Sequence, residues 1–264
     1  MKNIITLFLL SLVITSCGTI APNSQPVYYT PGLIANDISY LPKPMESDSL
    51  KTQNYFSGSF AGATLPESMG DITMGQLNYH RAHTFKNIKL AYGTFVFFGG
   101  TKETGYVNES RVVSKDFDGR GFYGGGLRTS IGVFETSGNT EFRILNWENT
   151  LSSEVGSYSS LRRKLRNDLE PLSVGSDKNT LLTTGASTEI IWRGSRNADR
   201  NYGFRLFIGS TLGLMKNMNY TENKLKGMAT DFSFFIKIKR AFATFSSGTN
   251  LQQYGSKITI GYAF

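Results

Sequence analysis

The sequence predicts an all-β fold: a small antiparallel transmembrane β-barrel of roughly eight to ten strands, with one short helix in a connection. Three observations support this prediction. Apolar side chains alternate with small or polar ones through most of the chain after residue 52, which is typical of strands whose two faces meet different surroundings. The 264 residues include 28 glycines and 13% aromatic residues but only 18% charged residues. Finally, the chain ends at Phe264 in an alternating apolar strand.

Nine alternating runs are expected to form strands, separated by segments rich in turn residues. They span 54–64, 71–81, 86–99, 122–135, 139–154, 179–193, 202–215, 232–245 and 257–264. The expected turns are 136–139, 194–201, 216–227 and 246–255, with a longer connection at 100–119. Both ends of the chain are expected on the periplasmic side, which requires an even number of strands. One strand is therefore miscounted, and we expect the error within 227–247 or in the N-terminal segment.

The surroundings of the apolar face decide the architecture. A soluble barrel buries that face, whereas a transmembrane barrel turns it outward to lipid. The opposite face is rich in glycine and alanine, as a narrow and crowded lumen requires. The runs are also long enough for tilted spans of roughly 9–11 residues. These features favour the transmembrane barrel, and a soluble lipocalin-like ligand-binding lipoprotein is the main structural alternative.

Residues 1–16 have the pattern of a secretory signal, in which Lys2 precedes an apolar run too short to span a bilayer. The only cysteine of the chain, Cys17, follows directly. The segment Ile14-Thr15-Ser16-Cys17 resembles the lipobox of bacterial lipoproteins. This resemblance implies cleavage before Cys17 and acylation of its sulfur and its new amine, which makes Cys17 the expected lipid anchor.

Residues 17–51 are expected to form a lipidated, proline-rich tether. Five of the seven prolines lie within 22–44, and proline lacks the amide donor that a sheet or helix interior needs. Gly18 and Thr19 stand where the related lipoproteins often carry an aspartate that retains them at the inner membrane. The resemblance therefore implies transport to the outer membrane. No acidic run follows Cys17, so the tether is expected on the periplasmic side, where it could dock against the barrel domain at 52–264.

The last eight residues, Lys257–Phe264, resemble the C-terminal strand signal of Gram-negative outer-membrane β-barrels. The resemblance implies that the barrel assembly machinery reads Tyr262 and Phe264 during biogenesis. Together with the lipobox, this signal makes the chain similar to the lipid-anchored outer-membrane barrels of Bacteroidota. The implied location is the outer membrane, with the anchor at Cys17.

Four ionisable residues on the polar faces of the expected strands are candidate lumen charges: Arg128, Arg205, Glu189 and Lys237. Buried charges need partners, so a network among them is expected for stability alone, and transport is the alternative role. The formal net charge is +8. Outer-membrane lipid headgroups or lipopolysaccharide phosphates are the expected counter-charges. The expected compartment excludes nucleic acid as a partner.

The segment Ser157–Leu169 is the one helix that the sequence predicts. Leucines recur at every fourth residue from Leu161, and Pro171 ends the pattern. The other faces carry basic side chains: Arg162, Arg163, Lys164 and Arg166. These residues form either an interfacial or partner-docking surface, or the solvated face of a packed connection.

No motif fixes a catalytic site, and the sequence predicts no cofactor and no metal. His80 and His83 are three residues apart, so on a strand they point to opposite faces. The glycines at 124–126 lack the following helix of a phosphate loop and are expected to relieve crowding. The leading hypothesis is a structural or accessory role in an envelope complex. The alternatives are a narrow channel for small solutes or lipids and a lipid-modifying enzyme using His80 or His83.

Overall fold

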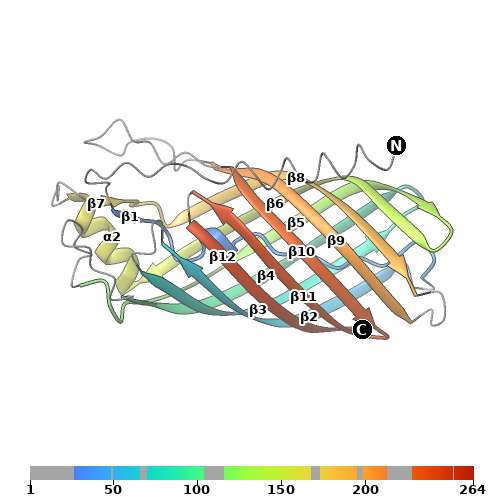
Figure 1. Cartoon of the computed structure of the whole chain (residues 1–264), viewed down its shortest axis with the longest axis horizontal. Helices are drawn as coiled ribbons and strands as arrows, with labels where there is room; N and C mark the ends of the chain where they lie inside the picture. Colours follow the sequence, from blue (N-terminus) through green and yellow to red (C-terminus); the bar gives the residue numbers. More distant parts are fainter. Residues whose placement is uncertain are drawn as a thin grey trace, which may run out of the picture.

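The computed structural model describes residues 27–48, 50–65, 70–103, 116–167, 173–194, 199–212, 228–251 and 253–264. Within these ranges ten antiparallel strands close into a barrel, in the order β10-β11-β12-β2-β3-β4-β5-β6-β8-β9 (Figure 1). The strands are β2 (Thr52–Thr64), β3 (Asp71–Thr84), β4 (Ile88–Lys102), β5 (Gly121–Ser137), β6 (Thr140–Gly156), β8 (Thr180–Arg193), β9 (Arg200–Leu212), β10 (Ala229–Ile238), β11 (Ala241–Asn250) and β12 (Gln253–Ala263). The predicted fold class is confirmed.

The strand missing from the sequence count lies within 227–247. The run expected as one strand at 232–245 is a hairpin, in which Ile238 of β10 pairs with Ala241 of β11. The turn is Lys239-Arg240, and Lys239 has a φ of 56°. Such two-residue turns usually carry glycine or asparagine, so this one left no sequence signal. The turn expected at 246–255 lies in that range but is shorter, because β11 and β12 pair as far as Asn250 and Gln253.

The first and last barrel strands close the cylinder. Residues Tyr254–Ala263 of β12 pair with Thr64–Tyr55 of β2. Beyond this ladder the amide of Phe264 donates to the carbonyl of Asn54 at 2.9 Å, and the Asn54 amide donates back at 3.0 Å. Among the described strands of the barrel none is an edge strand, which is the condition for a sheet surrounded by lipid.

The two ends of the barrel differ. The C-terminus shares one end with the connections 85–87, 138–139, 194–199 and 239–240, which we call the short-turn end. The long-loop end carries the connections 65–70, 103–120, 157–179 and 213–228, with the two-residue connection 251–252. Helix α2 (Ser157–Asn167) and the short parallel pair of β1 (Val27–Tyr29) and β7 (Ser173–Gly175) lie at this end, opposite the C-terminus in Figure 1.

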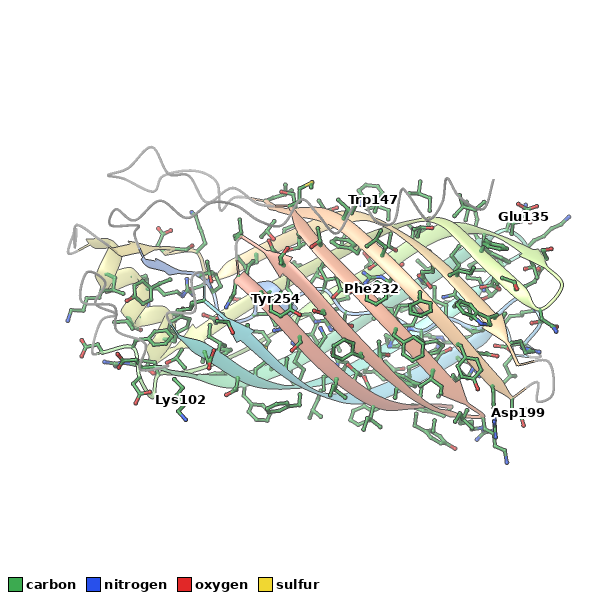
Figure 2. All side chains as sticks on the ribbon, viewed as in Figure 1. Lys102, Glu135, Trp147, Asp199, Phe232 and Tyr254 are labelled. Atoms are coloured by element: carbon green, nitrogen blue, oxygen red, sulfur yellow. The ribbon has the colours of Figure 1, made fainter. Side chains whose placement is uncertain are left out.

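The outer wall of the barrel is apolar. Alternate residues of each strand point outward, and their exposed fractions reach 67% for Phe60 and Ile260. In Figure 2, Trp147, Phe232 and Tyr254 lie along the wall, whereas Lys102, Glu135 and Asp199 lie near the two ends. The lipocalin-like alternative required the apolar faces to point inward, and it is therefore wrong. No helix in the described ranges is long and apolar enough to cross a membrane.

A β-bulge in β6 controls which side chains of that strand face inward. Arg143 pairs with Glu189 and Asn146 with Ser187, so Ile144 and Leu145 together oppose Thr188. Both residues of the bulge are exposed on the outer wall. Arg143 and Asn146 are three positions apart, so a regular alternation would place them on opposite faces. The bulge brings both into the lumen.

The apolar wall leads to a depth-dependent stability prediction. Leu206 lies in the middle of β9 and Leu212 at its end, and both point outward. In lipid vesicles, Leu206→Arg should lower the free energy of unfolding by about 2–4 kcal/mol, and the matched Leu212→Arg by about 0–1 kcal/mol. Equilibrium denaturant unfolding measures both values. Equal losses at the two positions would contradict a lipid-facing wall.

Candidate functional site

The lumen is filled by the N-terminal segment of the same chain. After β1 this segment forms the short 3-10 helix η2 (Ile34–Asn36) and then runs extended toward the short-turn end. We call residues 29–45 the plug. Every plug residue except Ala35 and Ser39 is buried. The proline-rich segment that the sequence analysis describes as a tether thus lies, over this part, inside the barrel.

Lumen side chains hold the plug mainly by its backbone carbonyls. An extended segment outside any sheet ladder needs other donors for its buried carbonyls, and the plug's prolines carry no N–H of their own. The donors come from several strands and α2: Tyr158 to Thr30 O (2.8 Å), Lys257 to Asn36 O (3.0 Å) and Ile38 O (2.7 Å), Arg128 to Asp37 O (2.9 Å), His80 to Pro42 O (3.0 Å), Arg143 to Lys43 O (2.9 Å), and Thr84 and Lys89 to Pro44 O.

Lumen carboxylates also accept from two backbone amides, one in the plug and one in the residue that follows it. The Gly32 amide donates to Glu154 at 2.7 Å, and the Glu46 amide donates to Glu141 at 2.7 Å. Charge-assisted bonds of this kind are stronger than bonds between neutral groups. The segment is therefore anchored to carboxylates near both ends of the barrel.

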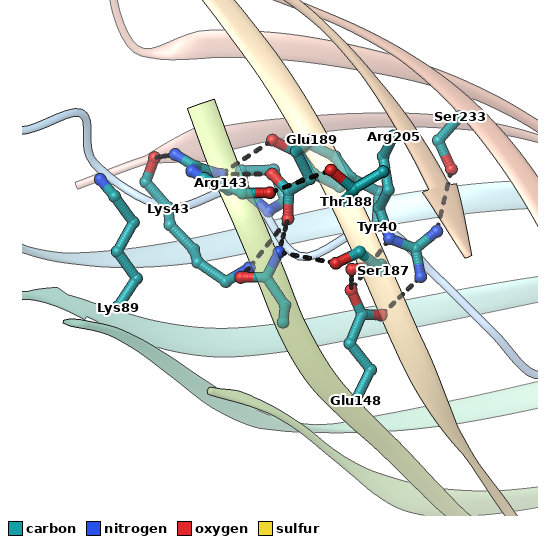
Figure 3. Close-up of polar contacts among 12 residues, drawn as sticks. Tyr40, Lys43, Lys89, Arg143, Glu148, Ser187, Thr188, Glu189, Arg205 and Ser233 are labelled. Atoms are coloured by element: carbon teal, nitrogen blue, oxygen red, sulfur yellow. Dashed lines mark hydrogen bonds and ion pairs between the residues drawn. The ribbon is translucent and has the colours of Figure 1, made fainter. Parts of the chain in front are cut away.

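The main ion cluster of the lumen surrounds Arg143 (Figure 3). Its guanidinium donates to Glu141 at 2.8 Å and to Glu189 at 2.6 Å. Lys43 of the plug pairs with Glu189 at 3.1 Å, and Lys89 pairs with Glu141 at 2.9 Å. Each of these five side chains is at most 1% exposed. Each carboxylate contacts two cations, so the two negative charges offset two of the three positive charges.

A second cluster joins β9 to its neighbour β10 and, across β8, to β6, without using the plug. Arg205 of β9 contacts Glu148 of β6 and Asp231 of β10, the latter at 2.6 Å. The Ser233 hydroxyl also donates to Asp231 at 2.6 Å. This cluster braces the barrel wall from inside.

All four candidate lumen charges point into the lumen. Arg128 holds the plug, Arg205 braces the wall, and Glu189 joins the plug to the Arg143 cluster. Lys237 donates to Gln53 at 3.2 Å and lies 3.9 Å from Asp48, just beyond the plug. The sequence analysis missed Arg143, Glu141 and Glu148 on β6 and the plug residue Lys43.

Helix α2 packs over the long-loop end of the lumen. Tyr158 contacts Phe117 and Phe122, and burial raises the pKa of its hydroxyl, which remains a donor to Thr30. Arg162 is buried and pairs with Glu154 at 2.8 Å. Of the other basic residues predicted to form a surface, Arg163 and Lys164 are exposed, and the Arg166 side chain lies outside the described residues.

The two histidines face opposite sides of β3, as the spacing predicts. His80 is in the lumen and stacks on Tyr55 with ring centroids 4.5 Å apart. His83 is on the outer side, where it contacts Thr52 at 2.9 Å. Among the described residues, no group of three histidine, cysteine, aspartate or glutamate side chains could hold a metal ion.

Glycines on the inner face make room for rings and for the plug. A Cβ atom at Gly126 would lie 2.8 Å from the ring of Phe95, and one at Gly124 would lie 2.7 Å from the ring of Phe97. At Gly255 it would lie 2.8 Å from the Asn36 side chain and 2.9 Å from Ala35. Relief of crowding therefore accounts for these glycines.

The structure describes the predicted C-terminal signal but not the predicted lipidation site. Cys17 lies outside the described residues. Tyr262 and Phe264 point outward at the short-turn end and are 49% and 54% exposed. Their role in assembly remains a prediction.

No family model and no curated protein sequence matches the chain. The solved structures that match the chain include the following three. The translocator domain of the autotransporter NalP from Neisseria meningitidis is 10% identical, with a TM-score of 0.42, covering 81% of this chain and 86% of that one. A Pseudomonas aeruginosa FadL homologue is 7% identical (TM-score 0.26, coverage 94% and 99%), and a mutant of the TodX monoaromatic hydrocarbon channel is 8% identical (TM-score 0.26, coverage 91% and 94%). Similarity at this level does not assign a role to this chain.

Removal of a charge from the Arg143 cluster should destabilise the protein more than removal of an exposed charge. Glu189→Gln keeps the side-chain shape but leaves Arg143 and Lys43 facing a neutral group, so it should lower the free energy of unfolding by about 3–5 kcal/mol. The control is Lys164→Ala, which removes an exposed pair with Asp116 and should cost about 0–1 kcal/mol. Denaturant unfolding in vesicles compares them, and similar losses would contradict the cluster's role.

Proposed function

We propose that this chain is an outer-membrane β-barrel, closed by its own N-terminal plug, that serves as a structural or accessory subunit of an envelope complex. Lipidation of Cys17 would add a second anchor to the membrane-spanning strands. The filled lumen is the observation that carries the proposal. A barrel whose inner surface is already occupied offers its loops, its wall and its termini to partners, rather than a pore.

The outer wall supports the membrane location. A closed antiparallel sheet satisfies its backbone groups between strands, and the apolar band faces outward, which together meet the requirements of a lipid-exposed barrel. The strands carry few outward charges, and these lie toward the rims, as for Arg81 and Glu135. Transmembrane barrels of this kind belong to the outer membrane of Gram-negative bacteria.

The plug contacts support a closed resting state. Its hydrogen bonds extend from Tyr158 at the long-loop end to Thr84 at the short-turn end. The Lys43–Glu189 ion pair adds a contact that solvent does not reach. Passage of a solute would require the loss of many of these contacts at once. The channel alternative thus requires withdrawal of the plug.

A conductance measurement separates the closed barrel from a channel. The wild-type protein in planar bilayers should give no stable ion conductance. Gly255→Leu forces side-chain atoms into η2 and should produce intermittent openings, because Asn36 and Ala35 have to move. Gly58→Leu is the control, since Gly58 faces outward and its nearest neighbour for a Cβ is 3.9 Å away. Steady conductance by the wild type would replace the closed barrel with a channel.

The accessory role predicts a companion protein. Crosslinking in cells followed by purification in mild detergent should recover the barrel with a partner in fixed ratio. Arg163→Glu and Lys164→Glu, both on the exposed face of α2, should weaken that recovery if the partner uses the basic surface. Recovery of the barrel alone after crosslinking would contradict an accessory role.

A further inference from the structure

The plug runs through the barrel in one direction without turning back. At the long-loop end, Tyr29 O accepts from Ser176 N at 3.1 Å and Thr30 O accepts from Tyr158. At the short-turn end, just beyond the plug, Asp48 pairs with Arg193, the last residue of β8. The described chain therefore begins at one end of the barrel and reaches the first barrel strand at the other.

Contacts between these points follow the same order along the barrel. Asp37 accepts from Thr183, near the start of β8 at the long-loop end. Farther along the same strand, Glu189 pairs with Lys43. A single strand, β8, thus meets three successive positions of the N-terminal segment from Asp37 to Asp48. Side-chain contacts with β8 therefore fix the direction of the plug through the lumen.

This path restricts where the residues before Val27 can go. A return to the short-turn end through the lumen is blocked, because the plug already fills it. A return outside the wall would place unpaired backbone groups in lipid, at a cost of several kcal/mol for each group. The remaining exit is the long-loop end. In outer-membrane barrels the short turns are periplasmic and the longer loops are extracellular.

We propose that the chain is threaded through its own barrel, so that its N-terminal end, including Cys17, is displayed on the outer surface of the outer membrane. This inference rests on the proposed membrane-spanning barrel and specifies its sidedness. It places the lipid of Cys17 in the outer leaflet, on the opposite side from the periplasmic tether that the sequence analysis expects. The exposed Arg163 and Lys164 of α2 lie at the same end, where lipid phosphates are available.

The single cysteine of the chain allows a direct test. Cys17→Ala, exported with a signal peptide that does not require lipidation, provides a cysteine-free full-length barrel. Single cysteines are then introduced as Ser24→Cys before the plug, Ser160→Cys on α2 and Ser47→Cys after the plug. Ser160 and Ser47 are exposed and mark the long-loop and short-turn ends. The probe is a large poly(ethylene glycol) maleimide that cannot cross the outer membrane, applied to intact and to permeabilised cells.

Ser24→Cys and Ser160→Cys should react fully on intact cells, and Ser47→Cys only after permeabilisation. The proposal is overturned if Ser24→Cys reacts only after permeabilisation, or if Ser160→Cys and Ser47→Cys exchange their behaviour. Heat-dependent gel mobility verifies that each variant is folded, and Asn23→Cys replaces Ser24→Cys if that variant is not. An epitope inserted after Asn23 in the lipidated wild-type chain should likewise be bound by antibody on intact cells. The labelling pattern is independent of conductance and of companion recovery, which test the proposed function.

Discussion

The bonding of plug carbonyls by lumen side chains is the constraint on which the rest of the structure depends. A narrow barrel has to fill its interior, and this one uses an extended, proline-containing segment that makes no sheet ladder across the lumen. The donors this segment needs are long and basic, such as Arg128, Arg143 and Lys257. Their charges in turn require the carboxylates of the same lumen. The basic lining thus follows from how the plug is held and does not by itself indicate transport.

The bulge in β6 makes this arrangement possible. Arg143 belongs to the plug-holding cluster, whereas Glu148 belongs to the wall-bracing cluster around Arg205. The two β6 residues differ by an odd number of positions, so a regular strand would direct one of them into lipid. The bulge at Ile144 and Leu145 adds one residue and so keeps both inside, and the two side chains of the bulge are apolar. The outer wall therefore stays apolar.

The alternation of apolar residues was sufficient to predict a barrel and the inward direction of Arg128 and Glu189, because strand periodicity is a local property. The hairpin at Lys239-Arg240 was missed because the fold imposes the left-handed turn on a residue that does not favour it. Arg143 was missed because the bulge at Ile144 and Leu145 puts it out of phase with the alternation in the rest of β6. The plug could not be predicted, since burial of residues 29–45 depends on donors from strands far away in sequence. Their proline content indicated only that they would not join the sheet.

Closure of the barrel and insertion of the plug depend on the same place in the chain. The plug leads into β2, and β2 is closed by β12, whose last bonds join Asn54 to Phe264. Asp37 and Lys43 have buried partners, so pulling the plug through a finished barrel would separate each charge from its partner. Closure of the strands around a plug already in position avoids this cost. The covalent link to β2 keeps the plug near that seam at high effective concentration. The same link fixes the plug's direction, because its C-terminal end must meet the strand that Phe264 closes.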